Sequence, residues 1–202
     1  MIGTGEPRPD LVQRLKEKYQ FLKVPERFEE LYPSAPVPVS FQGGRFRIDK
    51  REVGIAMLQF IPGMMLVDTQ SSTDDADSII DDYIATANAP RPETITVTGP
   101  SYYVSQIEFS MEKPPDPSPR FTDAARMMDR FLADYGTKLP MYGPWGVTLN
   151  VDAKNLGVMA PAFFNLERRV GFSFEQKVFF SQAPLRTKDH LIVLEKLDSI
   201  IH

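Results

Sequence analysis

The feature that most constrains this chain is an apolar segment, residues 53–67, that has no polar face. Side chains at both sets of alternating positions between Val53 and Phe60 are largely apolar. A strand with one exposed face alternates apolar and polar residues, so this pattern predicts a central or covered strand. Pro62-Gly63 interrupts the run and residues 64–67 resume it, which predicts a hairpin or a sharp bend.

An amphipathic helix is predicted directly after this segment. Ser71, Ser72 and Thr73 are candidate N-caps, and aspartates in the first turn suit the helix dipole. The apolar positions follow helical spacing. They are Ala76, Ile79, Ile80, Tyr83, Ile84 and Ala87.

This predicted helix is strongly acidic. Asp74, Asp77 and Asp81 project opposite the apolar stripe, with Asp75 and Asp82 to one side. No lysine or arginine occurs between residues 52 and 90, which is the most unusual local feature of the sequence. An acidic helix face suits a basic partner surface.

The N-terminal part of the chain predicts a helix over residues 9–22, whose apolar stripe is Val12, Leu15, Tyr19 and Leu22. The proline-rich residues 33–40 predict an extended strap. A strand is expected to begin at Arg45, after Gly43-Gly44 ends the strap. These features divide the chain into a helical segment, 1–40, and a single domain, 41–202.

The later part of the chain alternates groups of strands with single helices. Strands are predicted at 91–99 and 102–112, and a meander of short strands at 147–182. One helix is predicted around residues 121–135, and another begins at Thr187 or Asp189. Because helices do not follow every strand, we expect an α+β fold with a largely antiparallel sheet, helices packed on one face, and a C-terminal helix.

Composition excludes several chemistries. The 202 residues include no cysteine, which excludes disulfides, thiol catalysis and thiolate metal sites, and indicates the cytoplasm as the default location. No apolar run reaches the roughly 18 residues that a membrane helix needs, and the first ten residues lack the features of a secretory signal. A net charge of −4 provides no general attraction to nucleic acid or to anionic membranes.

Motifs for catalysis are scarce. The sequence has no HExxH, G-x-S-x-G, P-loop or G-x-G-x-x-G pattern, and therefore implies no cofactor. Its two histidines are His190 and the terminal His202. His190 has two interpretations, a general base or ligand, and a surface or half-buried helix residue near a cap. We favour the second, because no other histidine can join it in a metal site.

A divalent-metal site is the alternative use of the acidic helix. Asp74, Asp77 and Asp81 offer the oxygen ligands that Mg²⁺, Mn²⁺ or Ca²⁺ prefer, and such a site could serve a phosphoesterase. The spacing of a calcium-binding loop is absent. A solvated or partner-binding acidic face explains the same residues without a metal.

The basic clusters and the methionines each have a functional and a purely structural interpretation. Two short basic clusters could form part of a nucleic-acid face, but acidic residues interrupt them, so a solvated strand face is favoured. The first cluster is Arg45, Arg47, Lys50 and Arg51, and the second is Arg168 and Arg169. Nine methionines could line a cavity for a small apolar ligand, but core packing is the favoured explanation.

These observations lead to one functional prediction and two alternatives. We expect a non-enzymatic, cytoplasmic protein-binding or assembly module, acting as a homo-oligomer or as a subunit of a larger complex. Its predicted partner-binding residues are Asp74, Asp77, Asp81 and Asp82, which would meet a basic surface. The alternatives are the carboxylate-metal phosphoesterase and the apolar-ligand binder; neither membrane nor nucleic-acid binding is expected.

Overall fold

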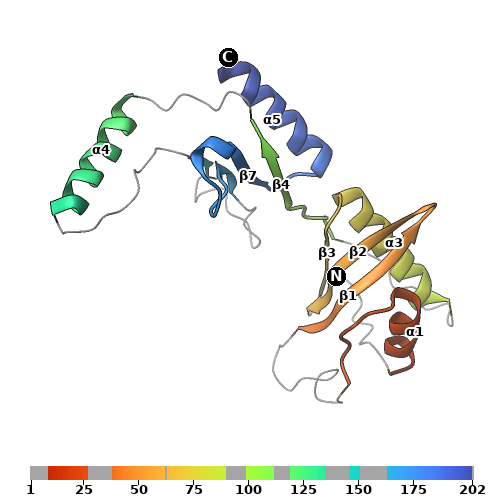
Figure 1. The fold of residues 1–202 in the computed structure, drawn as a ribbon. Helices are drawn as coiled ribbons and strands as arrows, with labels where there is room; N and C mark the ends of the chain where they lie inside the picture. Colours follow the sequence, from red (N-terminus) through yellow and green to blue (C-terminus); the bar gives the residue numbers. More distant parts are fainter. Residues whose placement is uncertain are drawn as a thin grey trace. The chain divides into compact units, whose positions relative to one another are not determined.

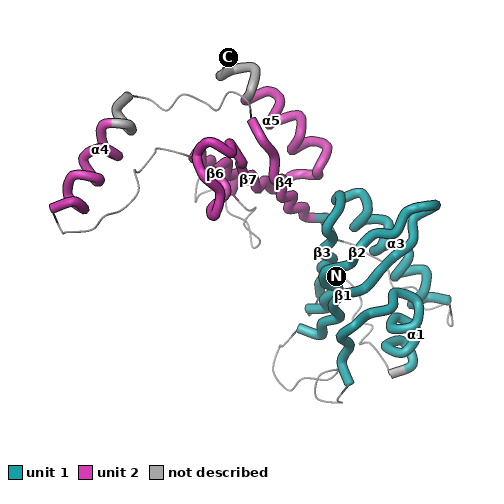
Figure 2. The backbone as a smooth tube through the Cα atoms, in the orientation of Figure 1, with its two compact units in different colours: residues 1–101 teal, residues 102–202 magenta. Residues whose placement is uncertain are grey.

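The structure is a computed structural model that divides the chain into two compact units, residues 1–101 and 102–202 (Figure 2). This division differs from the predicted one, since residue 40 lies within a strand of the first unit. The structure describes residues 9–26, 38–61, 63–89, 99–111, 119–134, 146–150 and 163–201. The predicted strand 91–99 and most of the predicted strap fall outside these residues.

The first unit contains a three-stranded antiparallel sheet in the order β1-β2-β3 (Figure 1). Its strands are β1 (Val39–Ile48), β2 (Arg51–Ile61) and β3 (Met64–Thr69). The two-sided apolar segment forms β2, the central strand, as the sequence predicts. The predicted hairpin is also confirmed, because β2 and β3 pair antiparallel up to Ile61 and Met64.

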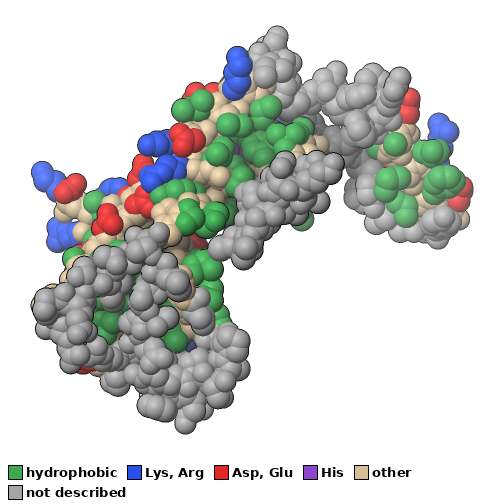
Figure 3. All heavy atoms as spheres, turned by 180° about the vertical axis from the view of Figure 1, so that it is seen from behind, with side chains coloured by type: hydrophobic (Ala, Val, Ile, Leu, Met, Phe, Trp, Pro, Cys, Tyr) green, Lys and Arg blue, Asp and Glu red, His purple; other side chains and the backbone are tan. Residues whose placement is uncertain are grey.

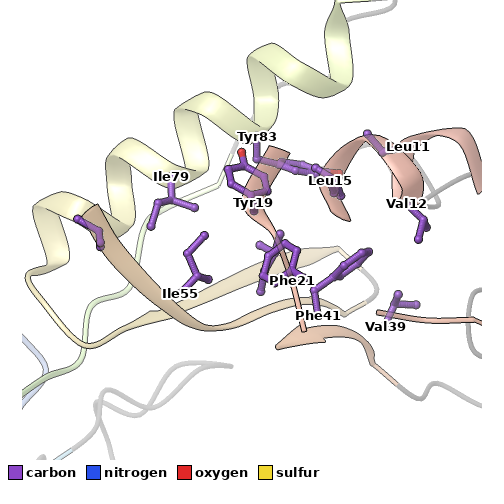
Figure 4. Close-up of a cluster of buried hydrophobic side chains, with 12 residues drawn as sticks. Leu11, Val12, Leu15, Tyr19, Phe21, Val39, Phe41, Ile55, Ile79 and Tyr83 are labelled. Carbon is purple, nitrogen blue, oxygen red and sulfur yellow. The ribbon is translucent and has the colours of Figure 1, made fainter. Parts of the chain in front are cut away.

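Helices α1 (Pro9–Tyr19) and α3 (Thr73–Asn88) share one hydrophobic core with this sheet. Figure 4 shows Leu15 and Tyr19 from α1 converging with Ile79 and Tyr83 from α3 above Ile55 of the sheet. Aromatic rings run in contact through this core, with centroids 5.0–6.0 Å apart. The contacting rings are Tyr19, Phe21, Phe41, Phe60 and Tyr83.

Helix α1 ends earlier than the sequence predicts. Gln20 adopts a left-handed conformation (φ 52°), so the helix stops at Tyr19 and the chain continues extended. As a result Phe21 is buried, whereas Leu22, predicted to be in the buried stripe, is 89% exposed. The backbone nitrogens of Leu22 and Lys23 both donate to the Gln42 carbonyl, which ties this segment to β1.

The glycine pair lies inside β1 and does not precede it. The predicted strand began at Arg45, but β1 starts at Val39 and passes through Gly43 and Gly44. A Cβ atom on Gly44 would lie only 2.4 Å from the Phe21 ring. Glycine is therefore required because the Phe21 ring packs directly on the strand backbone.

The second unit contains a four-stranded antiparallel sheet in the order β4-β7-β6-β5. Its strands are β4 (Ser105–Ser110), β5 (Gly146–Leu149), β6 (Phe164–Arg168) and β7 (Val178–Ala183). Helix α5 (Thr187–Ile201) packs on this sheet through Val193, Leu194 and Leu197. The buried residues beneath it are Phe164, Leu166, Phe179 and Ala183.

Helix α4 (Pro119–Asp134) forms where the sequence predicts a helix, but much of its apolar stripe lies at the surface. Ala125 is buried, whereas Met127, Met128 and Phe131 are each about half exposed. With these helices and two antiparallel sheets, the α+β class is confirmed. The sequence predicts one sheet, whereas the structure has two, one in each unit.

Candidate protein-binding surfaces

Helix α3 is fixed at its N-terminus by a capping box and an ion pair. The Asp75 backbone nitrogen donates to the Ser72 hydroxyl at 3.2 Å, and the Ser72 backbone nitrogen donates to the Asp75 carboxylate at 3.5 Å. Both terminal nitrogens of Arg51, on β2, also donate to this carboxylate, which is only 4% exposed. The Arg51 hydrogen bonds lower the pKa of Asp75 to about 2, against the opposing effect of burial.

A second carboxylate fixes the middle of α3 to α1. The Tyr19 hydroxyl donates to Asp82 Oδ2 at 2.6 Å, and Lys18 Nζ donates to Asp82 Oδ1 at 2.8 Å. Lys18 also donates to the Thr86 hydroxyl one turn further on, at 2.7 Å. Burial and the bond to Asp82 raise the pKa of Tyr19 well above its usual value. Asp82, which the sequence groups with the partner-binding aspartates, is therefore bonded within the unit.

The other aspartates of α3 face outward. Asp74 and Asp81 are exposed and Asp77 is partly exposed. Their spacing of three and then four residues places them on adjacent turns of one helix face. We call Asp74, Asp77 and Asp81 the acidic ridge; the structure brings these three predicted residues onto one surface and separates them from Asp82.

The structure also shows whether other groups join the acidic ridge in a metal site. Among the described residues, no three histidine or carboxylate side chains come close enough together to hold an ion. The predicted metal alternative therefore gains no support from the geometry.

A second surface, which the sequence does not reveal, lies between β6 and β7. We call residues 169–177, which join these strands, the hairpin tip. It exposes three large apolar side chains: Val170 is 90% exposed, Phe172 43% and Phe174 45%. Exposed aromatic side chains on an ordered loop are typical of protein contact sites.

Local bonds connect the residues of the hairpin tip to one another and to β6. Arg168 Nη1 donates to the Phe174 carbonyl at 2.9 Å, and its guanidinium lies 4.6 Å from the centre of the Phe174 ring. The Ser173 backbone nitrogen donates to Gln176 Oε1 at 2.7 Å, which caps a short 3₁₀ turn, η2 (Phe174–Gln176). Gly171 has φ +95°, a conformation that other residues rarely adopt.

Three of the arginines considered for nucleic-acid binding make contacts within their own units. Arg169 Nε lies 2.9 Å from Glu108, and its guanidinium stacks on Phe180. Arg45 pairs with Glu52 at 3.3 Å across the first sheet. Burial lowers the pKa of Arg168, which packs between Phe174 and Phe179. These contacts are those of an ordinary strand surface and its ion pairs.

Exposed apolar side chains also occur on α4. Figure 3 shows hydrophobic atoms among charged ones on this helix, at the right of the view, and the exposed residues include Met127 and Phe131. Groups of large apolar side chains on a protein surface often mark a site that contacts another protein or a ligand.

His190 lies in α5 and is completely buried, not at the helix surface. Its ring nitrogens contact Ser105 of β4 and Ser181 of β7. Sequence reasoning missed this arrangement, because serines at inward strand positions look like surface residues when a strand is considered alone.

Comparison with protein-family models, with curated proteins and with solved structures finds no match. Among the helices that the structure describes, none combines the length and the apolar character that a membrane crossing requires.

Proposed function

We propose that this chain is a cytosolic protein-binding module that serves as a subunit of a larger assembly and catalyses no reaction of its own. Its acidic ridge would meet a basic surface of a protein partner. The observation that carries this proposal is the division of the aspartates of α3. Asp75 and Asp82 bond to Arg51, Lys18 and Tyr19 of the same unit, while Asp74, Asp77 and Asp81 lie together on the outer face of the helix.

The anchoring supports binding because it removes freedom before the partner arrives. Arg51 bonds to the first turn of α3, and Lys18 and Tyr19 bond to its middle. The helix that bears the outward carboxylates is therefore attached to both the sheet and α1. A preorganised charged surface loses less entropy on association than a mobile one. Charges at the edge of an interface mainly set the association rate and the choice of partner.

The test is affinity purification from the native host with a ridge variant and a matched control. The ridge variant is Asp74→Asn, Asp77→Asn and Asp81→Asn. The control, Glu17→Gln, Asp49→Asn and Asp68→Asn, removes three exposed charges from the same unit. We expect the ridge variant to recover at least tenfold less partner, a loss of about 1.4 kcal/mol, and the control to match the parent chain.

Salt provides an independent check on the same proposal. Raising NaCl from about 0.1 M to about 1 M shortens the Debye length from about 10 Å to about 3 Å, and should release the partner from the parent chain. Equal recovery with the ridge variant and the parent chain, or binding indifferent to salt, would remove the ridge from the proposal.

The hairpin tip favours a second contact of a different kind. The side chains of Val170 and Phe172 are exposed. They take no part in the contacts of Arg168, which bonds to the Phe174 carbonyl and packs on the Phe174 ring. We expect Val170→Ser with Phe172→Ser to weaken partner binding by shortening the lifetime of the complex. The matched control is Val104→Ser with Tyr102→Ser, one exposed aliphatic and one exposed aromatic residue of the same unit. Equal dissociation rates for the two double variants would exclude the tip.

A further inference from the structure

The buried imidazole of His190 connects three elements of the second unit. Its Nδ1 lies 2.8 Å from the Ser105 hydroxyl oxygen on β4, and its Nε2 lies 2.8 Å from the Ser181 hydroxyl oxygen on β7. The Ser181 hydroxyl in turn donates to the Asn165 carbonyl of β6 at 2.8 Å. His190 and Ser181 are 0% exposed and Ser105 is 4% exposed.

The direction of these bonds follows from counting protons. Ser181 has one hydroxyl proton, which it donates to Asn165, so its oxygen accepts the proton of His190 Nε2. A neutral imidazole has a single N–H, so Nδ1 accepts the hydroxyl proton of Ser105. Every proton in this chain of bonds has an acceptor only while His190 is neutral.

Protonation of His190 would break this arrangement. A proton on Nδ1 would turn that nitrogen into a donor toward Ser105, whose own proton would then lose its acceptor. The imidazolium would also be buried, and burial lowers the pKa of His190. Ser105 and Ser181 are buried as well, so a substrate in solution could not reach either hydroxyl or the imidazole. His190 and its two serines are therefore not arranged for catalysis.

The charged groups around His190 do not favour an imidazolium. The strand register places Arg168 of β6 on the inner face of the sheet, the face that α5 covers. It places Glu108 of β4 and Glu167 of β6 on the outer face. The inward positions of β4 and β7 are uncharged. Arg186, the residue directly before α5, lies about one turn from His190, and its side chain donates to the Tyr103 hydroxyl.

The other charged residues beside His190 on α5 are Lys188, which is exposed, and Asp189. Adjacent helix positions point about 100° apart, so Asp189 does not share the buried face of His190. Within the described residues, the charged groups on the same side of the sheet as His190 are therefore two cations, Arg168 and Arg186. Neither would stabilise a positively charged imidazolium.

We infer that His190 is a proton-sensitive lock that holds α5 on β4 and β7 when neutral and releases the helix when protonated. Release would uncover the apolar residues that α5 covers, among them Phe164, Leu166 and Phe179. The second unit would thus have a closed form near neutral pH and an opened form in mildly acidic conditions. This inference is independent of the proposed binding function.

Hydrogen exchange of the full chain tests the lock. After correction for the intrinsic effect of pH, we expect amides of α5, β4 and β7 to open at least tenfold more often at about pH 5 than at about pH 7. Amides of β2 and α3 in the first unit serve as an internal reference and should not change. His190→Gln, which forms hydrogen bonds but does not titrate, should abolish the pH effect. A flat response in the parent chain, or an undiminished response in His190→Gln, would overturn the inference.

A second measurement remains decisive if the glutamine variant does not fold. Nuclear magnetic resonance can follow the only two histidines, with His202→Ala identifying the signals of His190. We expect His190 to be the Nε2–H tautomer at neutral pH and to titrate below the ordinary value of about 6.5. Titration at or above that value, or the opposite tautomer, would contradict the lock.

Discussion

At the scale of single residues, the aspartates of α3 show how one residue type acquires two roles within sixteen positions. The helix periodicity separates outward from inward positions, and in this respect the acidic ridge is predictable from sequence. The roles of Asp75 and Asp82 are not, because Arg51 and Lys18, which bind them, lie 24 and 64 residues away. Only the folded arrangement shows that Asp75 and Asp82 bond to Arg51 and Lys18.

Asp75 should contribute to stability, whereas Asp81 should not. Asp75→Asn keeps the shape of the side chain but removes the charge that receives two bonds from Arg51. We expect the free energy of unfolding at neutral pH to fall by about 2 kcal/mol. Asp81→Asn, an exposed change on the same helix, should stay within about 0.5 kcal/mol. Urea unfolding measures both, and equal effects would contradict the anchoring role.

The acid dependence of stability provides the matching test for Asp75. Its folded pKa of about 2 lies below the ordinary 3.8, so its contribution is complete above about pH 4 and is lost as the pH falls toward 2. We expect the stability of the parent chain to decrease over this interval by about 2 kcal/mol more than that of Asp75→Asn. Parallel pH profiles of the two proteins would exclude this linkage.

At the scale of elements, sequence periodicity predicted the main helices and the central strand, but not where two of them begin or end. The apolar stripe of α1 extends through Leu22 in the sequence, yet the left-handed Gln20 turns the chain so that Phe21 enters the core. The consequence appears in β1, where Phe21 occupies the space above Gly44. A boundary set by such a tertiary contact has no local pattern in the sequence.

The Phe21–Gly44 contact predicts a specific sensitivity. Gly44→Ala should lower the free energy of unfolding by at least about 2 kcal/mol, because its Cβ would overlap the Phe21 ring. Gly54→Ala on the neighbouring strand is the control, since its nearest contact, Gln70, is 3.9 Å away. A second change, Phe21→Ala, should reduce the penalty of Gly44→Ala in a double-mutant cycle. Additive losses would show that the ring contact is not the cause.

At the scale of the whole molecule, the two units have separate cores. The core residues of the first unit fall between Leu11 and Ala87, and those of the second between Phe109 and Leu197. The α+β class was predictable because strands occur in groups between single helices. The division into two units was not, because no composition change marks residue 101. The hairpin tip and the His190 lock depend on strand pairing that the sequence does not specify.

Separate cores predict that residues 1–101 fold without the rest of the chain. We expect this fragment to show a dispersed amide spectrum and one cooperative unfolding transition by circular dichroism. Asp75→Asn should destabilise the fragment as much as it destabilises this unit in the full chain. A fragment without cooperative unfolding would mean that its core requires the second unit.

The most direct test of the proposed function is zero-length carbodiimide crosslinking of the chain in its native host, followed by mass spectrometry. This chemistry joins carboxylates to lysines in contact, and α3 offers carboxylates but no lysine of its own. We expect crosslinks from Asp74, Asp77 or Asp81 to lysines of one stoichiometric protein partner. Recovery of the chain without crosslinks from α3, or with crosslinks only elsewhere on its surface, would contradict it.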